Sequence, residues 1–168
     1  MSTTKVIQVD VVEISSIISE LEFVQKIPSI HLAVFSNKNL QKLQEIISNI
    51  RNGYNEAMQN VEKHEEYRTK LRELGIKYGI LDENGESRVV DGKIDISEED
   101  TKKFEEEKNK VDEEFSETIK KINEINKEYE DIISSKMNVE IDVASIQHFP
   151  QEITGESIKN IVMFGLIE

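Results

Sequence analysis

The sequence predicts an α+β fold that is mostly α: a long antiparallel coiled-coil hairpin with a β-hairpin at its tip, projecting from a small α/β base formed by both termini. Two long segments carry apolar side chains at alternating three- and four-residue spacing, which is typical of coiled-coil helices. A turn-rich stretch lies between them, and both ends contain short alternating segments typical of strands. We assign residues 1–36 and 137–168 to the base and 37–136 to the helical hairpin, with its β-hairpin connection at 80–96.

The N-terminal region predicts a strand, a helix and a second strand. Residues 5–11 (KVIQVDV) alternate apolar and polar side chains, as a half-buried strand does. The following helix has its apolar residues three and four positions apart and ends before Pro28, which disfavours helical geometry at Ile27. Residues 29–35 (SIHLAVF) then predict a second strand. The apolar positions of the helix are Ile14, Ile17, Ile18, Leu21 and Val24.

The first long helix is predicted over residues 37–74. Ser36 or Asn37 is the expected N-cap, and Gly75 and Gly79 close the segment. Gly53 lies inside it and weakens the helix by about 1 kcal/mol relative to Ala. The heptad positions are Leu40, Leu43, Ile47, Ile50, Tyr54, Ala57, Val61, His64, Arg68 and Leu71.

The connection contains two turns and a helix start. Asp91-Gly92 is a preferred sequence for a type I′ hairpin turn, and residues 82–85 (DENG) predict another turn. Ser97 is the expected cap of the second long helix, with Asp100 at the third helical position in place of the Glu of a capping box.

The second long helix is predicted over residues 97–135 and mirrors the first. Its heptad positions are Phe104, Lys108, Val111, Phe115, Thr118, Ile122, Ile125, Tyr129 and Ile132. Each of the two predicted long helices is roughly 50 Å long at the usual rise of about 1.5 Å per residue. Pairing outward from the connection gives the layers Leu71–Phe104, His64–Val111, Ala57–Thr118, Ile50–Ile125 and Leu43–Ile132.

The C-terminal region predicts a strand near residues 139–147, within NVEIDVASIQHF, and a helix beginning at Thr154 after Pro150. Ile158, Ile161, Val162 and Leu166 share one side of that helix. Together with the N-terminal elements, these segments form the predicted base.

Composition limits the classes of function. The formal net charge is −13, which disfavours free nucleic acid because phosphate contacts require clustered Lys and Arg. The chain contains no Cys, so disulfides and thiolate catalysis are excluded. We see neither a secretory signal nor an apolar run of the ~18 residues that a membrane span needs. A cytoplasmic location without membrane contact is therefore expected.

No motif predicts catalysis, a cofactor or a metal. His31, His64 and His148 lack the spacing of metal ligands, and the sequence contains no P-loop, dinucleotide fingerprint or nucleophile elbow. Residues 82–85 are similar to part of a calcium loop, but the Gly and Glu spacing fails. We expect no catalytic residues.

Five residues near the predicted tip are candidate contacts for a ligand or partner: Arg68, Lys77, Tyr78, Lys108 and His64. Cations beside an aromatic ring suit an anionic small molecule. Alternatively, the polar heptad residues set the register of the coiled coil, and Glu65, Glu66 and Glu107 neutralise them.

Four segments, YRTKLRELGIKYGILDENGE, DGKIDI, NVEIDVASI and ITGESIKNIVMFGLIE, follow one another from about residue 60 to the end. In pattern they resemble a group of small proteins encoded by tailed phages and prophages of low-GC bacteria. This chain has a longer N-terminal region and a longer second helix than that group. The resemblance implies a phage origin and a non-enzymatic role. Such accessory proteins include inhibitors of host defence, among them binders of nucleotide immune signals.

Residues 37–136 also resemble prefoldin subunits in layout, although prefoldin lacks the additional terminal strands and helices. Three functions remain open. The first is a homo-oligomeric binding protein that sequesters or blocks a host factor or an anionic nucleotide-type signal. The second is a structural or assembly protein, either a virion accessory or a prefoldin-like chaperone. The third is an acidic mimic of nucleic acid that uses the carboxylates of residues 98–131.

Overall fold

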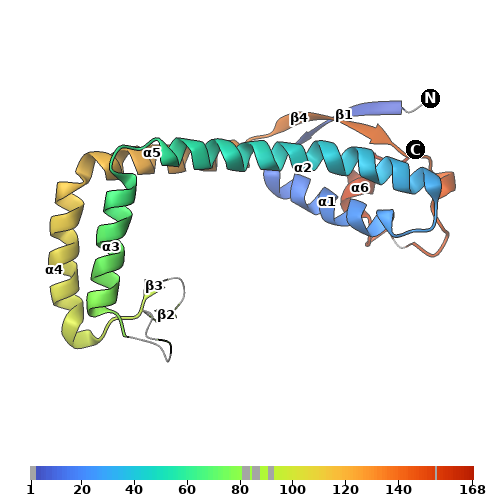
Figure 1. Ribbon diagram of the computed structural model, residues 1–168. Coiled ribbons are helices and arrows are strands. Elements are labelled where there is room, and N and C mark those ends of the chain that lie inside the picture. The colour runs from blue at the N-terminus through green and yellow to red at the C-terminus, as the bar shows by residue number, and fades with distance from the viewer. Residues whose placement is uncertain (1–2, 81–83, 85–87, 91–92, 154) are drawn as a thin grey trace. The chain divides into compact units, whose positions relative to one another are not determined.

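The computed structural model describes residues 3–80, 84, 88–90, 93–153 and 155–168. The fold is α+β and mostly helical, with two small antiparallel two-stranded sheets among the described residues (Figure 1). The chain divides into two compact units. Unit 1 consists of residues 1–54 and 128–168, and unit 2 of residues 55–127. The predicted boundaries at 36 and 137 both fall inside unit 1.

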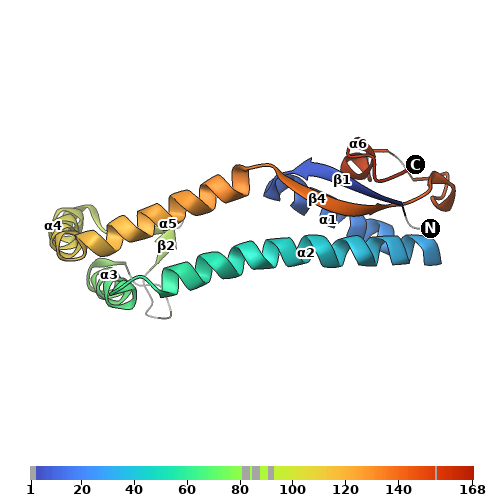
Figure 2. The ribbon, with the colours of Figure 1, turned by 90° about the horizontal axis from the view of Figure 1, so that it is seen from above.

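Unit 1 is built on the sheet formed by β1 (Thr3–Val9) and β4 (Met137–Val143), which lie side by side in Figure 2. Their antiparallel register pairs Thr3 with Val143 and Val9 with Met137. The segment after β4 contains the short 3-10 helix η1 (Ile146–His148) and α6 (Lys159–Met163). Both sheet strands were predicted, although each begins and ends earlier than expected: β1 was placed at 5–11 and β4 at 139–147. Helix α6 is shorter than the predicted one, whose expected first residue, Thr154, lies outside the described residues.

Helix α1 (Val11–Gln25) follows β1 directly. Asp10 caps it: the Asp10 carboxylate accepts the Glu13 N–H, and the Glu13 carboxylate accepts the Asp10 N–H, each at 2.9 Å. This reciprocal pair is a capping box. The predicted apolar stripe is confirmed, because Ile14, Ile17, Leu21 and Val24 are all buried.

The predicted strand at residues 29–35 is wrong, because these residues begin the long helix α2 (Ile30–Gln59). Leu32 is buried while Ile30 and Val34 are exposed, and further buried positions follow at helical spacing. The apolar–polar alternation in residues 29–35 therefore reflects a helix with one buried apolar face and not a strand. The predicted N-caps Ser36 and Asn37 lie inside α2.

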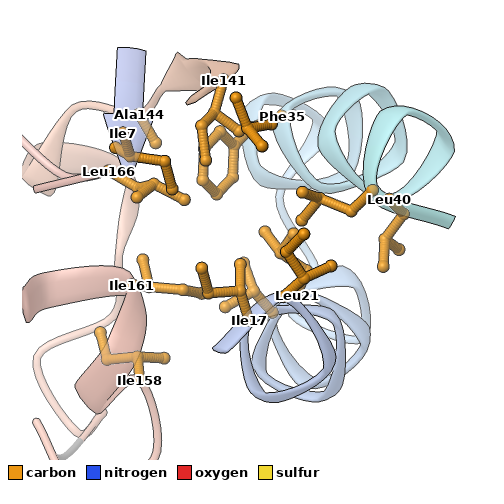
Figure 3. Close-up of a cluster of buried hydrophobic side chains, with 14 of the residues drawn as sticks. Ile7, Ile17, Leu21, Phe35, Leu40, Ile141, Ala144, Ile158, Ile161 and Leu166 are labelled. Atoms are coloured by element: carbon orange, nitrogen blue, oxygen red, sulfur yellow. The ribbon is translucent and has the colours of Figure 1, made fainter. Parts of the chain in front are cut away.

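A single apolar cluster occupies the centre of unit 1 (Figure 3). It joins the inner face of the sheet to α1, to the first half of α2 and to the C-terminal segment. Its members are Ile7, Val9, Ile14, Ile17, Leu21, Val24, Leu32, Phe35, Leu40, Leu43, Val139, Ile141, Ala144, Ile158, Ile161 and Leu166.

In unit 2 each predicted long helix is interrupted. The first ends at Gln59 and resumes as α3 (His64–Tyr78) after Lys63, which has a left-handed φ of 60°. The second is divided into α4 (Glu98–Glu114) and α5 (Ser116–Ser134) by Phe115. The Thr118 hydroxyl donates to the Glu62 carbonyl at 3.0 Å, so α5 satisfies a backbone group that the first break leaves without a helical partner.

Helices α3 and α4 pack antiparallel (Figure 1), and their aromatic pairs place the register one heptad away from the predicted one. Phe104 contacts Tyr78, with ring centroids 6.1 Å apart, and Phe115 contacts Tyr67 at 5.6 Å. The prediction ended the first helix at Gly75, but α3 continues to Tyr78 and stops at Gly79. Gly75 instead permits close approach, because a Cβ there would overlap the Cδ1 of Ile94.

The connection contains the predicted hairpin strands, β2 (Val89–Val90) and β3 (Lys93–Ile94). Their turn at 91–92 lies outside the described residues, as does the turn at 82–85 apart from Asn84. The expected cap of α4 is confirmed, since the Ser97 hydroxyl accepts the Asp100 N–H at 3.2 Å.

Candidate functional site

Two histidine side chains stack against each other at the surface of unit 1. His31 lies in the first turn of α2 and His148 ends η1. Their rings are 4.2 Å apart and 8° from parallel. The C-terminal segment holds η1 in place: the Ile146 N–H donates to the Glu168 carbonyl at 2.6 Å, and the Glu168 N–H donates to the Ala144 carbonyl at 2.9 Å.

An open hollow of about 430 Å³ lies beside the two rings. Apolar side chains from α2 and β4 form part of its wall, and a lysine, two carboxylates and two hydroxyls supply the polar part. Its lining consists of Thr3, His31, Val34, Phe35, Lys38, Asp142, Val143, Ala144, Ser145, His148 and Glu168. A surface of this mixed character suits a partner that offers both an apolar and a polar group.

Asp142 ties the sheet to α2 and is mostly buried. Its carboxylate accepts a hydrogen bond from Lys42 at 2.9 Å and lies 3.7 Å from Lys38. Its backbone N–H and C=O both bond to the buried side-chain amide of Asn39, at 2.8 and 3.0 Å. The Asn39 amide therefore occupies the edge of β4 as a neighbouring strand would.

The hollow brings a serine, two histidines and an aspartate together, so a nucleophilic site has to be considered. Nucleophilic catalysis requires the hydroxyl within hydrogen-bonding reach of a base that a third group orients. Among the described residues, no hydrogen bond joins the Ser145 hydroxyl to His31 or His148. The Asp142 carboxylate is directed to Lys38 and Lys42. These described side chains therefore do not form the hydrogen-bonded relay that activates a serine nucleophile.

Exposed apolar side chains flank the histidines. Ile30 is 81% exposed and Val34 52%, and their i, i+4 spacing places them on one face of α2. On η1, Ile146 is 65% exposed. We call Ile30, His31, Val34, Ile146 and His148 the histidine surface.

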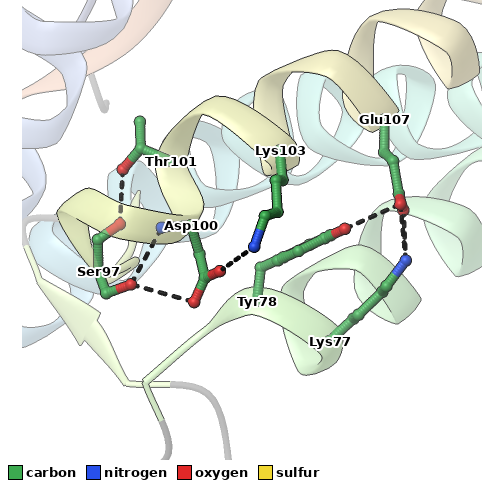
Figure 4. Close-up of polar contacts among 7 residues, drawn as sticks. All are labelled: Lys77, Tyr78, Ser97, Asp100, Thr101, Lys103 and Glu107. Carbon is green, nitrogen blue, oxygen red and sulfur yellow. Dashed lines mark hydrogen bonds and ion pairs between the residues drawn. The ribbon is translucent and has the colours of Figure 1, made fainter.

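The candidate residues predicted from sequence lie in unit 2. Lys77 and Tyr78 come together at Glu107: the Lys77 ammonium donates to both carboxylate oxygens at 2.7 Å, and the Tyr78 hydroxyl donates to one of them at 2.8 Å (Figure 4). The Lys77 ammonium lies 4.9 Å from the Tyr78 ring centroid. The hydrogen bond from Lys77 lowers the pKa of Glu107, and Glu107 raises the pKa of Lys77.

The other three candidates contact other carboxylates: Arg68 and His64 share Glu65, and Lys108 contacts Asp112. Arg68 contacts Glu65 at 3.1 Å, and Lys108 pairs with Asp112. The His64 Nδ1 lies 3.9 Å from a Glu65 carboxylate oxygen.

Asp112 also accepts a hydrogen bond from the Tyr67 hydroxyl at 3.0 Å. Burial of the Tyr67 side chain, together with this contact, raises the pKa of Tyr67 to about 12. Each predicted cation therefore already has a carboxylate partner, which an anionic ligand would have to displace.

In the sequence His31 and His148 are isolated histidines, and nothing there predicts that they form a pair. No local pattern signals a contact between residues so far apart in the chain. The one available signal for the nearby anchor is a polar Asn39 beside Leu40, where the apolar face of α2 is buried.

No known protein family, no curated protein and no solved structure matches this chain. Within the described residues, no cluster of three or more His, Asp or Glu side chains could hold a metal ion. No helix in the same part of the chain is both long and apolar enough to cross a membrane.

Proposed function

We propose that this protein is a non-enzymatic, phage-encoded binding protein that blocks a host protein in the bacterial cytoplasm through the histidine surface. The observation that carries this proposal is the exposure of Ile30 and Val34, at 81% and 52%, beside a hollow of about 430 Å³. Clustered exposed apolar side chains with polar groups at their margin are typical of protein-interaction sites.

The charges around the hollow favour a protein over an anionic nucleotide. The carboxylates of Asp142 and Glu168 line it, and Lys38 is already close to Asp142. In unit 2, Lys77, Arg68 and Lys108 are paired with carboxylates. With a net charge of −13, the chain attracts a basic partner over a distance and repels a free anion.

The test compares a histidine-surface variant with a matched control. The double variant Ile30→Lys/Val34→Lys places charge on the surface, whereas Val162→Lys alters a residue of similar exposure, 53%, elsewhere in unit 1. We expect a host protein that cross-links to the wild type and to Val162→Lys, and whose yield falls at least tenfold with the double variant. Equal yields from both variants would place the contact elsewhere.

A nucleotide panel provides the opposing arm. A ligand present at about 100 times its dissociation constant stabilises the folded state by roughly 2.7 kcal/mol. If a nucleotide raises the melting temperature by an amount that corresponds to this free energy, the signal-sequestering alternative is favoured over the protein-blocking one.

A second candidate function, a chaperone or assembly role, is favoured by exposed apolar residues in unit 2. Val89 and Val90 are 61% and 50% exposed, and Ile76 is 57% exposed. A holdase uses such surface to bind an unfolded client. The double variant Val89→Lys/Val90→Lys should then lose suppression of client aggregation while Val12→Lys, exposed by 72% in unit 1, retains it. No suppression by the wild type would remove this candidate.

A further inference from the structure

Among the described residues, no strand covers the edge of β1 that faces away from β4. β1 pairs with β4 along its full length from Thr3 to Val9. On the far side of β4, the Asn39 amide binds Asp142 and the C-terminal segment bridges to Ala144. Within the described residues, the backbone of β1 makes no hydrogen bond to any segment besides β4.

This edge has few of the features that normally prevent strands from associating. Proteins protect open edges with prolines, bulges or charged residues, lysine in particular. Residues 3–9 (TTKVIQV) contain no proline, one charge at Lys5 and a register with β4 that runs without a bulge. Five of the seven side chains are β-branched, and Val6 is 61% exposed.

We infer that two copies of this chain pair through β1, antiparallel and centred on Val6, to form a four-stranded sheet of order β4–β1–β1–β4. A two-fold axis at this residue places Val6 opposite Val6, Lys5 opposite Ile7 and Thr4 opposite Gln8. No like charges then lie directly opposite, and β-branched side chains meet across the central pair.

The register favours a second copy as the occupant, because β1 complements itself about Val6 without opposing like charges. Two chains of net charge −13 repel each other wherever their acidic surfaces meet. β1 contains no acidic residue, so this edge permits approach without opposing carboxylates. A sheet of only two strands, β1 and β4, is marginally stable by itself. The two strands of a second copy would extend its hydrogen-bonded ladder to four strands. The contact is confined to one seven-residue strand from each copy, so we expect a small interface and a reversible dimer. This inference does not depend on the proposed host partner.

The two-fold axis gives a charge-swap test, because residue 6 faces itself. Val6→Asp and Val6→Lys each place like charges opposite one another, so each variant alone should dimerise at least tenfold more weakly than the wild type. A mixture of the two should restore a heterodimer. Sedimentation velocity over the micromolar range measures all three, and circular dichroism verifies folding. Val162→Asp, on another surface, should dimerise like the wild type.

A second measurement does not depend on how a charged variant folds. The chain has no cysteine, so Val6→Cys introduces one thiol, and opposed strand residues are close enough for a disulfide. Mild oxidation should link two copies of Val6→Cys but not of Val12→Cys, although Val12 is 72% exposed. A monomeric wild type, dimerisation unaffected by Val6→Asp, or a strand contact only with a different protein would overturn the inference.

Discussion

Units 1 and 2 use similar helical patterns but are held together differently. Every member of the buried apolar cluster belongs to unit 1. In the described part of unit 2 the buried apolar side chains are Val61, Leu74 and Phe115, and α4 buries none of its residues. Instead, α3 and α4 contact each other through aromatic rings and through pairs such as Lys77–Glu107 and Tyr67–Asp112. Periodicity in sequence therefore does not reveal how much a helix buries.

The difference has an energetic consequence. Burying a large aliphatic side chain contributes roughly 1.5–3 kcal/mol, whereas an exposed ion pair contributes little because water and salt screen it. We therefore expect the stability of unit 1 to depend on its core and to respond weakly to salt. Unit 2 should open more readily and respond to both salt and pH.

The largest expected effect is in the core of unit 1. Ile141 on β4 is fully buried. Ile141→Ala should lower the free energy of unfolding by about 2–5 kcal/mol, because it removes apolar contacts and leaves a cavity. Urea denaturation followed by circular dichroism measures the loss. Val162→Ala, at a 53% exposed position, should change the value little, and equal losses would contradict the contrast between core and surface.

The second-largest loss in the free energy of unfolding is expected at Asn39. Asn39→Ala removes both hydrogen bonds to the backbone of Asp142 and leaves a buried N–H and C=O without these partners. The expected loss is roughly 2–4 kcal/mol by the same denaturation measurement. Asn37→Ala, two residues earlier on an exposed part of α2, is the matched control. A loss below that of the control would show that the Asn39 amide does not anchor the edge of β4.

A smaller effect is expected at the break between α2 and α3. Thr118→Val keeps the shape of the side chain but removes the hydrogen bond to the Glu62 carbonyl. The loss should be about 1 kcal/mol, and hydrogen exchange should increase around residues 60–63. Thr101→Val, which removes an exposed hydroxyl bond to the Ser97 carbonyl, should leave exchange at 60–63 unchanged.

The smallest effect concerns the Lys77–Glu107 pair. Because the folded pKa of Glu107 lies below its ordinary value of 4.5, its stabilisation is present above that value and lost as pH falls through the folded pKa. Unit 2 should thus loosen in acid, and added salt should weaken the pair at neutral pH. Glu107→Gln should reduce both responses in thermal melts, while Glu106→Gln should not. Identical acid and salt responses in the two variants would exclude this pair as their source.

The parts of the fold that follow local rules were predictable. The stripe of α1, strands β1 and β4 and the Ser97 cap depend on residues close together in sequence. The strand predicted at 29–35 failed because seven residues are too few to distinguish strand alternation from one apolar face of a helix. The break after Gln59 was missed because it depends on the left-handed Lys63 and on Thr118 in another helix.

The candidate site was less predictable than the fold. Asn39 and Asp142 are 103 positions apart, and nothing local indicates that a side-chain amide replaces a strand. His31 was expected in a strand, which concealed its position beside His148. The cations chosen from sequence lie beside acidic residues. The alternative that glutamates neutralise them agrees with the Arg68–Glu65 and Lys77–Glu107 pairs, whereas Lys108 pairs with Asp112.

Hydrogen exchange measured by mass spectrometry at low and high salt tests the contrast between the two units most directly. We predict the slowest exchange in β4, α1 and residues 32–43 of α2, with rates insensitive to salt. Exchange in α3 and α4 should be faster by orders of magnitude and should accelerate as salt is added. Equal protection in both units, or slower exchange in α3 and α4 than in β4, would contradict the account.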